Sequence, residues 1–171
     1  MDYYLSLPTL LDEEAATAAL AAWRAAGGRV NPGLLRRYDG DYRRWLDRLA
    51  ACRTDPGAGE VPQTFYFMKD ASGRIVGAAS LRHYLDGSNI IDGGHVAYGI
   101  APMSRGQGLG NEVLRLALRQ LRTMGIARVL VTCDADNIPS QRVILYNGGV
   151  LENEAVDEDG APICRYWIGN A

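Results

Sequence analysis

Apolar side chains recur along this chain with two different periods, and these periods predict its elements. Within Asn111–Met124 they return every three or four residues, which is the repeat of an amphipathic helix. Thr64–Met68 and Ile75–Leu81 are short runs of apolar residues, and the hairpin signal Asp70–Gly73 separates them. Ala127–Cys133 is almost continuously apolar, as expected of a strand that is covered on both faces.

The same patterns along the whole chain predict seven strands and four helices. We expect the strands at Tyr3–Leu7, Thr64–Met68, Ile75–Leu81, His95–Ala101, Ala127–Cys133, Val150–Val156 and Ile163–Ile168. We expect the helices at Asp12–Ala26 with Asp12 as its cap, at Asp41–Cys52, at Asn111–Met124, and from Pro139 to about Asn147. An antiparallel run followed by one crossover helix predicts an α/β fold with a mixed sheet, in which the fourth and fifth strands are parallel. The chain contains no internal repeat and no linker, so we expect residues 1–171 to form a single domain.

Composition narrows the classes of function. The chain is 47% hydrophobic and 22% charged, with a formal net charge of -2, which is ordinary for a globular protein. Arginines alternate with acidic residues in most segments instead of forming a basic face, so we expect no nucleic-acid partner. No apolar run approaches the roughly 20 residues that span a bilayer, and residues 1–11 lack a basic leader. We therefore expect no membrane partner and a cytoplasmic location.

The cysteines and histidines do not predict a metal site. Cys52, Cys133 and Cys164 are far apart in the sequence and have no ligand spacing to His83 or His95. We expect reduced, buried thiols and no metal cofactor.

The segment Arg105-Gly106-Gln107-Gly108-Leu109-Gly110 lies between a predicted strand and a predicted helix. Such a turn directs unpaired N–H groups outward, and the positive end of the helix adds to them, so it favours a phosphate or pyrophosphate. A Walker A loop would need Gly-Lys-Ser/Thr, and the dinucleotide motif would need glycine in place of Asn111. A nucleotide site and a tight structural turn remain as other interpretations.

Spacing adds a family resemblance. Arg105, Gly108 and Gly110 fit the pattern Q/R-x-x-G-x-G/A, and Asn137 with Ser140 fits a helix opening N-x-x-S/A further along the chain. These motifs, together with the order of elements over residues 64–167, resemble the GNAT family of acetyltransferases. The resemblance is weak before Thr64.

The resemblance implies a site for acetyl-CoA as co-substrate. The backbone amides from Gly106 to Asn111 would hold the pyrophosphate, and the strand around Ile100 would pair with the pantetheine arm and polarise the thioester. Gly99 would allow the β-bulge that the family usually has there. Asn137 would bond the arm, although its residue type alone also suits a helix cap. The implied cofactor residues are Ile100, Arg105, Gly106, Gln107, Gly108, Leu109, Gly110, Asn111, Asn137 and Ser140.

The proton-transfer residues depart from the family pattern. Many members place a catalytic tyrosine seven residues after the asparagine, where this chain has Ile144. Tyr146 is turned by about 200° around the helix from that position, so we expect it to pack instead of to react. His95 is our candidate base, because it begins the fourth strand and imidazole has a suitable pKa. Tyr98 on the same strand would belong either to the core or to the acceptor pocket.

The function expected from these features is acetyl transfer from acetyl-CoA to a primary amine of a small molecule or a protein. The alternative is a non-catalytic module that binds acyl-CoA as a sensor or scaffold. The acidic residues near the last hairpin would either be solvated or attract a cationic acceptor; they are Glu152, Glu154, Asp157, Glu158 and Asp159. The exposed edge of that hairpin would permit contact in a homodimer.

Overall fold

A computed structural model describes residues 2–28 and 30–171, without the side chain of Ser88. The strands of this part are β1 (Tyr4–Ser6), β2 (Gln63–Lys69), β3 (Ile75–Arg82), β4 (Val96–Ile100), β5 (Arg128–Asp134), β6 (Gly149–Val156) and β7 (Pro162–Gly169). The helices are α1 (Glu13–Ala25), α2 (Tyr42–Thr54), α3 (Leu109–Thr123) and α4 (Ile138–Tyr146). None of the helices described is both long and apolar enough to cross a membrane.

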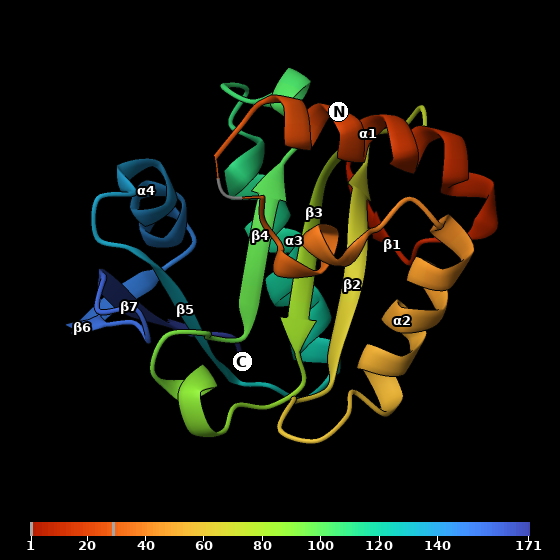
Figure 1. The fold of residues 1–171 in the computed structure, drawn as a ribbon. Coiled ribbons are helices and arrows are strands. Elements are labelled where there is room, and N and C mark those ends of the chain that lie inside the picture. Colours follow the sequence, from red (N-terminus) through yellow and green to blue (C-terminus); the bar gives the residue numbers. More distant parts are fainter. Residues whose placement is uncertain (1, 29) are drawn as a thin grey trace.

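The strands form two antiparallel sheets (Figure 1). One has the order β1-β2-β3-β4, and the other has the order β5-β7-β6. The α/β class, the seven strands and the four helices are therefore confirmed in the described part of the chain. In the described part of the chain, the paired neighbour of β4 is β3 and that of β5 is β7. The parallel pairing of β4 with β5 therefore stays a prediction.

The two sheets meet at one point and separate from there. At the start of β4, the His95 N–H donates to the Leu130 carbonyl of β5 (2.7 Å), and His95 Nδ1 accepts from the Leu130 N–H (3.0 Å). From this joint β4 and β5 diverge toward the top of the view in Figure 1. The gap between them is the feature that positions the candidate site.

Two apolar cores hold this arrangement in place. The amphipathic face of α3 packs Val113, Leu114 and Leu121 against β3, β4 and the second sheet. On the other face of the first sheet, α1 and α2 bury Trp23 and Trp45. Figure 1 shows α3 behind the sheet and α1 and α2 in front of it. Burial on both faces stabilises the sheet without any contribution from the edge of β4 that faces the gap.

Three local expectations need correction. The helix α3 begins at Leu109, two residues before Asn111, so it starts inside the glycine segment. No element was expected between the first two helices, but Gly33–Arg37 forms a short 3-10 helix there. Asp12 stands at the start of α1 but does not bond its amides, because its carboxylate accepts from Thr9 and from the Lys69 ammonium.

Candidate active-site cleft

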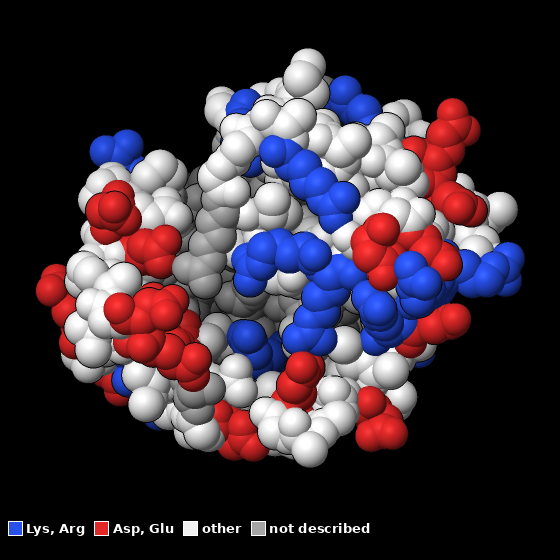
Figure 2. Space-filling view, in the orientation of Figure 1, with Lys and Arg blue, Asp and Glu red and all other residues white. Residues whose placement is uncertain are grey.

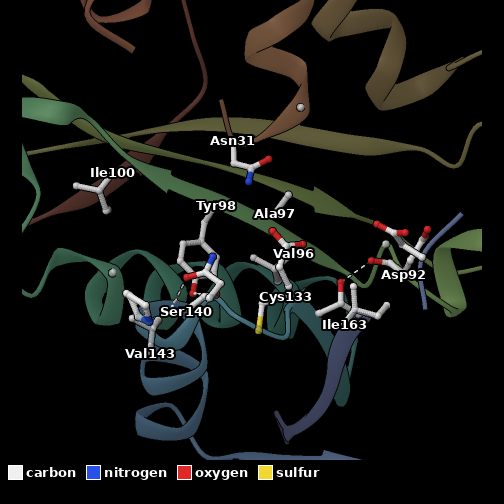
Figure 3. Close-up of a pocket in the computed structure, with 18 of the residues that line it drawn as sticks. Asn31, Asp92, Val96, Ala97, Tyr98, Ile100, Cys133, Ser140, Val143 and Ile163 are labelled. Carbon is white, nitrogen blue, oxygen red and sulfur yellow. Dashed lines mark hydrogen bonds between the residues drawn. The ribbon is translucent and has the colours of Figure 1, made fainter. Parts of the chain in front are cut away.

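A cleft of about 1090 Å³ opens between β4 and β5. Side chains of both strands line it, and the starts of α3 and α4 close one end. Figure 3 shows Ile100 at that end and Asp92 at the other, with Tyr98, Ser140 and Cys133 between them. Different residues therefore line the two ends and the middle of the cleft.

The edge of β4 presents free backbone groups to the cleft. On the β3 side, the Arg82 N–H donates to the His95 carbonyl (2.8 Å) and the Ala101 N–H donates to the Val76 carbonyl (2.9 Å). Because peptide groups alternate in direction along a strand, Tyr98 and Ile100 turn their N–H and carbonyl groups away from β3. The Ile100 carbonyl accepts from Arg105 Nε (3.3 Å). The N–H groups of Tyr98 and Ile100 remain directed toward the gap.

The expected bulge at Gly99 is wrong. The β3–β4 register runs without a shift from Leu81 opposite Val96 to Gly77 opposite Ile100. Gly99 has another reason to be glycine: a Cβ there would lie 2.1 Å from the Asn31 carbonyl oxygen. Asn31 thus crosses directly over β4 and becomes part of the cleft wall.

The glycine turn closes the Ile100 end of the cleft with backbone donors. Gly106 and Gly108 have left-handed φ angles of 75° and 73°, and both Cβ positions are open. Leu109 and Gly110 begin α3, so their amides have no preceding helical carbonyl to bond. The Asn111 N–H instead donates to the Gly108 carbonyl (3.2 Å), so it contributes less to an anion site than we expected.

The middle of the cleft holds three polar groups from β4, β5 and α4. Tyr98 Oη and Ser140 Oγ are 3.0 Å apart (Figure 3). Burial raises the pKa of the Tyr98 phenol to about 12 and that of the Cys133 thiol to about 11. Both groups are therefore protonated at neutral pH. Asn137 Oδ1 accepts from the Ser140 N–H (3.1 Å), so Asn137 caps α4 and still lines the cleft.

Carboxylates gather at the end that is remote from the glycine turn. Asp92, Asp157 and Glu158 line the cleft there. The Glu158 N–H donates to Asp92 Oδ2 (3.4 Å), which brings the β6–β7 turn to the loop before β4. In Figure 2 acidic side chains cover the β6–β7 side of the hollow, and arginines cover the side of the segment between α1 and α2. The acids near the last hairpin are thus partly a cleft wall and not only a solvated turn.

His95 lies outside the cleft lining and is 7% exposed. Burial, followed by the charge of Arg82, lowers its pKa, so the imidazole is neutral at neutral pH. Since Nδ1 accepts from the Leu130 N–H, the ring proton is assigned to Nε2. No lone pair is then free to take a proton from an amine, and the geometry gives His95 the role of joining β4 to β5.

Comparisons with known proteins agree with this geometry. The sequence model of the acetyltransferase (GNAT) domain matches residues 4–150. The chain belongs to the GNAT family of acetyltransferase domains. A mycothiol acetyltransferase of Pseudarthrobacter chlorophenolicus is 32% identical over 80 residues, which are 46% of this chain and 25% of that protein. The chain thus spans about a quarter of the length of this curated relative.

Two solved GNAT structures show the same fold. Mycobacterium smegmatis RimJ, solved with CoA-disulfide, has a TM-score of 0.70 at 17% identity, covering 96% of this chain and 80% of that one. Mutant forms of the spermidine/spermine N-acetyltransferase SpeG from Vibrio cholerae have a TM-score of 0.69 at 15% identity, covering 98% and 94%. Both identities are low, so these likenesses establish the fold and leave the acceptor open.

Within this GNAT domain, the usual tyrosine position on α4 is part of the core. Ile144 is completely buried against α3 and the second sheet. Tyr146 is 76% exposed, so it is turned away from the cleft as expected, but the packing role that we expected for it is wrong. Neither residue reaches the cleft.

The predicted cofactor residues divide into those that line the cleft and those that lie outside it. Those that line the cleft are Ile100, Arg105, Gly106, Gly108, Leu109, Gly110, Asn137 and Ser140. Gln107 and Asn111 lie outside the lining. Cys133 and Asn31 line it without having been predicted. The place of Cys133 at the end of a buried strand, before the polar Asp134–Asn137 loop, was the one sequence signal available for it.

Proposed function

We propose that this GNAT domain transfers the acetyl group of acetyl-CoA to a primary amine of a small molecule or a protein. The observation that carries the proposal is the order of groups along one cleft. Backbone donors lie at the glycine turn, an unpaired strand edge follows, and carboxylates lie at the far end. This order suits the phosphates, the pantetheine arm and a cationic acceptor, in that sequence.

The glycine turn fits the phosphates of the co-substrate. The amides of Leu109 and Gly110 lie at the positive end of α3, and the open space at Gly106 and Gly108 lets phosphate oxygens approach the backbone. Arg105 lines the same end and adds a positive charge. A Cβ at Gly110 would lie 2.8 Å from the Val143 side chain of α4. Glycine at this position therefore also lets the start of α3 pack closely against α4.

The edge of β4 fits the pantetheine arm. An extended amide chain pairs with an exposed strand edge through main-chain hydrogen bonds. The Ile100 and Tyr98 N–H groups would donate to the arm and to the thioester carbonyl oxygen, and the second bond would stabilise the oxyanion as the amine attacks. Asn137 would add its amide NH₂ from the opposite wall, since its carbonyl oxygen already caps α4.

The carboxylate end fits a cationic acceptor. An alkyl amine with a pKa near 10.4 arrives as an ammonium ion at neutral pH and must lose a proton before it attacks. Asp92, Asp157 and Glu158 would attract that ion, and the proton would leave to solvent at this end of the cleft. Direct attack then forms the amide. His95 has no part in this scheme, because its Nδ1 is already engaged.

The experiment that tests the proposal is thiol release from acetyl-CoA with a panel of amines. The panel includes polyamines, amino sugars, amino acids and peptide N-termini, with matched alcohols as controls. We expect release with at least one cationic amine and none with the alcohols. Thiol release that is the same with and without every amine would contradict amine acetylation.

A second candidate function is a module that binds acyl-CoA without turnover. The burial of Ile144 at the usual tyrosine position favours it, because that position cannot supply a proton. Calorimetry separates the two candidates: tight binding of coenzyme A with no thiol release across the whole panel would support the module.

A further inference from the structure

The hydrogen bond between Tyr98 and Ser140 crosses the middle of the cleft, from β4 to the start of α4. It joins the two walls beside the free N–H groups of Tyr98 and Ile100. Cys133 lies at the same level on β5 (Figure 3). Burial raises the pKa of the Cys133 thiol, and a hydrogen bond from Ser140 lowers it in part. Among the residues that the structure describes, no other tyrosine lines the cleft.

The pair keeps a proton available for a third partner. Two hydroxyl groups that share one hydrogen bond retain one O–H that is not used between them. The Cys133 thiol, which is the present neighbour of this O–H group, is a weak acceptor. A thiolate is a much stronger acceptor, because a hydrogen bond to an ionised group is roughly twice as strong as a neutral one.

We infer that the Tyr98–Ser140 hydroxyl pair stabilises the coenzyme A thiolate as it leaves. The inference rests on the proposed function. It assigns stabilisation of the leaving thiolate to two hydroxyl groups, because Ile144 has no group that could provide it. The amine nitrogen bonds the acetyl carbon, the C–S bond breaks, and its electron pair remains on sulfur. The amine releases its proton to solvent, and the hydroxyl pair donates a hydrogen bond to the sulfur.

The pair donates this bond without losing its proton. The phenol of Tyr98, with its pKa raised to about 12, holds its proton more tightly than a thiol with a pKa of about 8.5. The hydroxyl thus remains a donor throughout the pH range in which acetyl transfer would be measured. Tyr98 would thus take the place of the tyrosine that is usual on α4. It lies on β4, and its hydroxyl reaches Ser140 of the same helix.

The test measures the pKa of the coenzyme A thiol in the complex. The thiolate is followed by its ultraviolet absorbance during a pH titration, with the desulfo-coenzyme A complex as the blank for the protein thiols. We expect the bound thiol of the unaltered protein to have a pKa at least about one unit below that of free coenzyme A, which is a tenfold stabilisation of the thiolate. Tyr98→Phe and Ser140→Ala should each remove most of this shift.

Tyr146→Phe is the matched control, because Tyr146 lies on α4 and is exposed. It should leave the bound thiol pKa unchanged and alter turnover by less than about threefold. In Tyr98→Phe, kcat with the best amine should fall by about tenfold or more, whereas KM for acetyl-CoA stays within about threefold, the pattern of a group that acts in the transition state.

The outcomes separate this inference from the proposed function. Coenzyme A that binds with the same thiol pKa in the unaltered protein, Tyr98→Phe and Ser140→Ala would overturn the inference and leave the proposed function standing. Failure of the unaltered protein to bind coenzyme A at all would overturn both.

Discussion

At the scale of single residues, four glycines near the cleft are required for three different physical reasons. Gly106 and Gly108 adopt left-handed φ angles in open space, Gly110 lets α3 approach Val143, and Gly99 lies beneath the Asn31 carbonyl. The spacing of Gly106, Gly108 and Gly110 predicted their turn, and the phosphate site there stays a prediction. The reason for Gly99 came from a contact with a residue 68 positions away, which no local pattern encodes.

His95 shows how a residue type can suggest a chemistry that its surroundings do not favour. Its position at the start of the fourth strand was correct, and imidazole is a common base. The structure buries it and directs Nδ1 at the Leu130 N–H, so its lone pair holds two strands together.

We predict that His95→Asn retains activity and reduces the sensitivity of stability to acid. Burial lowers the folded-state pKa of His95 below its usual 6.5, so as pH falls the unfolded chain takes up a proton before the folded one. Stability should therefore decrease with acid below about pH 6.5, by up to about 1.4 kcal/mol per pH unit from this group. An Asn oxygen can accept from Leu130 without titrating.

Urea unfolding of both proteins at pH 7, 6 and 5 measures this difference, and His83 titrates equally in both. Activity at pH 7.5 should stay within about threefold, whereas removal of a true general base typically costs about 10²–10⁴-fold. A loss in that range would restore His95 as the base.

At the scale of elements, α4 presents its residues in three directions. Ser140 and Val143 face the cleft, Ile144 enters the core, and Tyr146 is exposed. Helical spacing predicted that Tyr146 does not share the direction of Ile144. It could not show that Tyr98, on a strand 42 residues before Ser140, would reach this helix.

The start of α3 supports a prediction about co-substrate binding. Gly108→Glu should weaken coenzyme A affinity by about a hundredfold or more, because the side chain fills the open space and places a negative charge beside the phosphates. The variant also costs about 1–3 kcal/mol of stability, since a side chain is forced to a left-handed φ. Calorimetry at a temperature where the variant is folded measures the affinity.

Gly125→Glu is its matched control. Gly125 follows the other end of α3, has a similar φ of 79°, and has an equally open Cβ position away from the cleft. It should lose similar stability and keep its coenzyme A affinity. Equal affinities for the Gly108 and Gly125 variants would remove the glycine turn from the site.

At the scale of the whole molecule, the cleft exists because two antiparallel sheets meet at one joint and separate. Each sheet is stabilised by its own ladders and by the cores around α3 and around α1 and α2. The edge of β4 can therefore remain unpaired without loss of the fold. Under the proposed function, the carboxylates at the far end of the cleft would favour a cationic acceptor.

We predict that Glu158→Gln raises KM for a cationic amine by a factor of about 1.5 to 5, the effect of about 0.2–1 kcal/mol typical of an exposed charge pair. Salt should reduce the difference, because exposed charges are screened. Initial rates at low and high ionic strength measure both effects. Asp159→Asn is the control, since Asp159 has the same charge in the same turn but does not line the cleft. Equal KM changes in the two variants would exclude a specific attraction at this end.

The sequence by itself determined the elements, their order, the glycine turn and the family, because periodicity and turn chemistry are local properties of the chain. It also showed that Ile144 stands where a tyrosine is usual. Only the tertiary structure decided which face of each element lines the cleft. The pairing of Tyr98 with Ser140, the burial of His95 and the passage of Asn31 over Gly99 depend on contacts between distant segments. Such contacts are fixed by packing and not by local spacing.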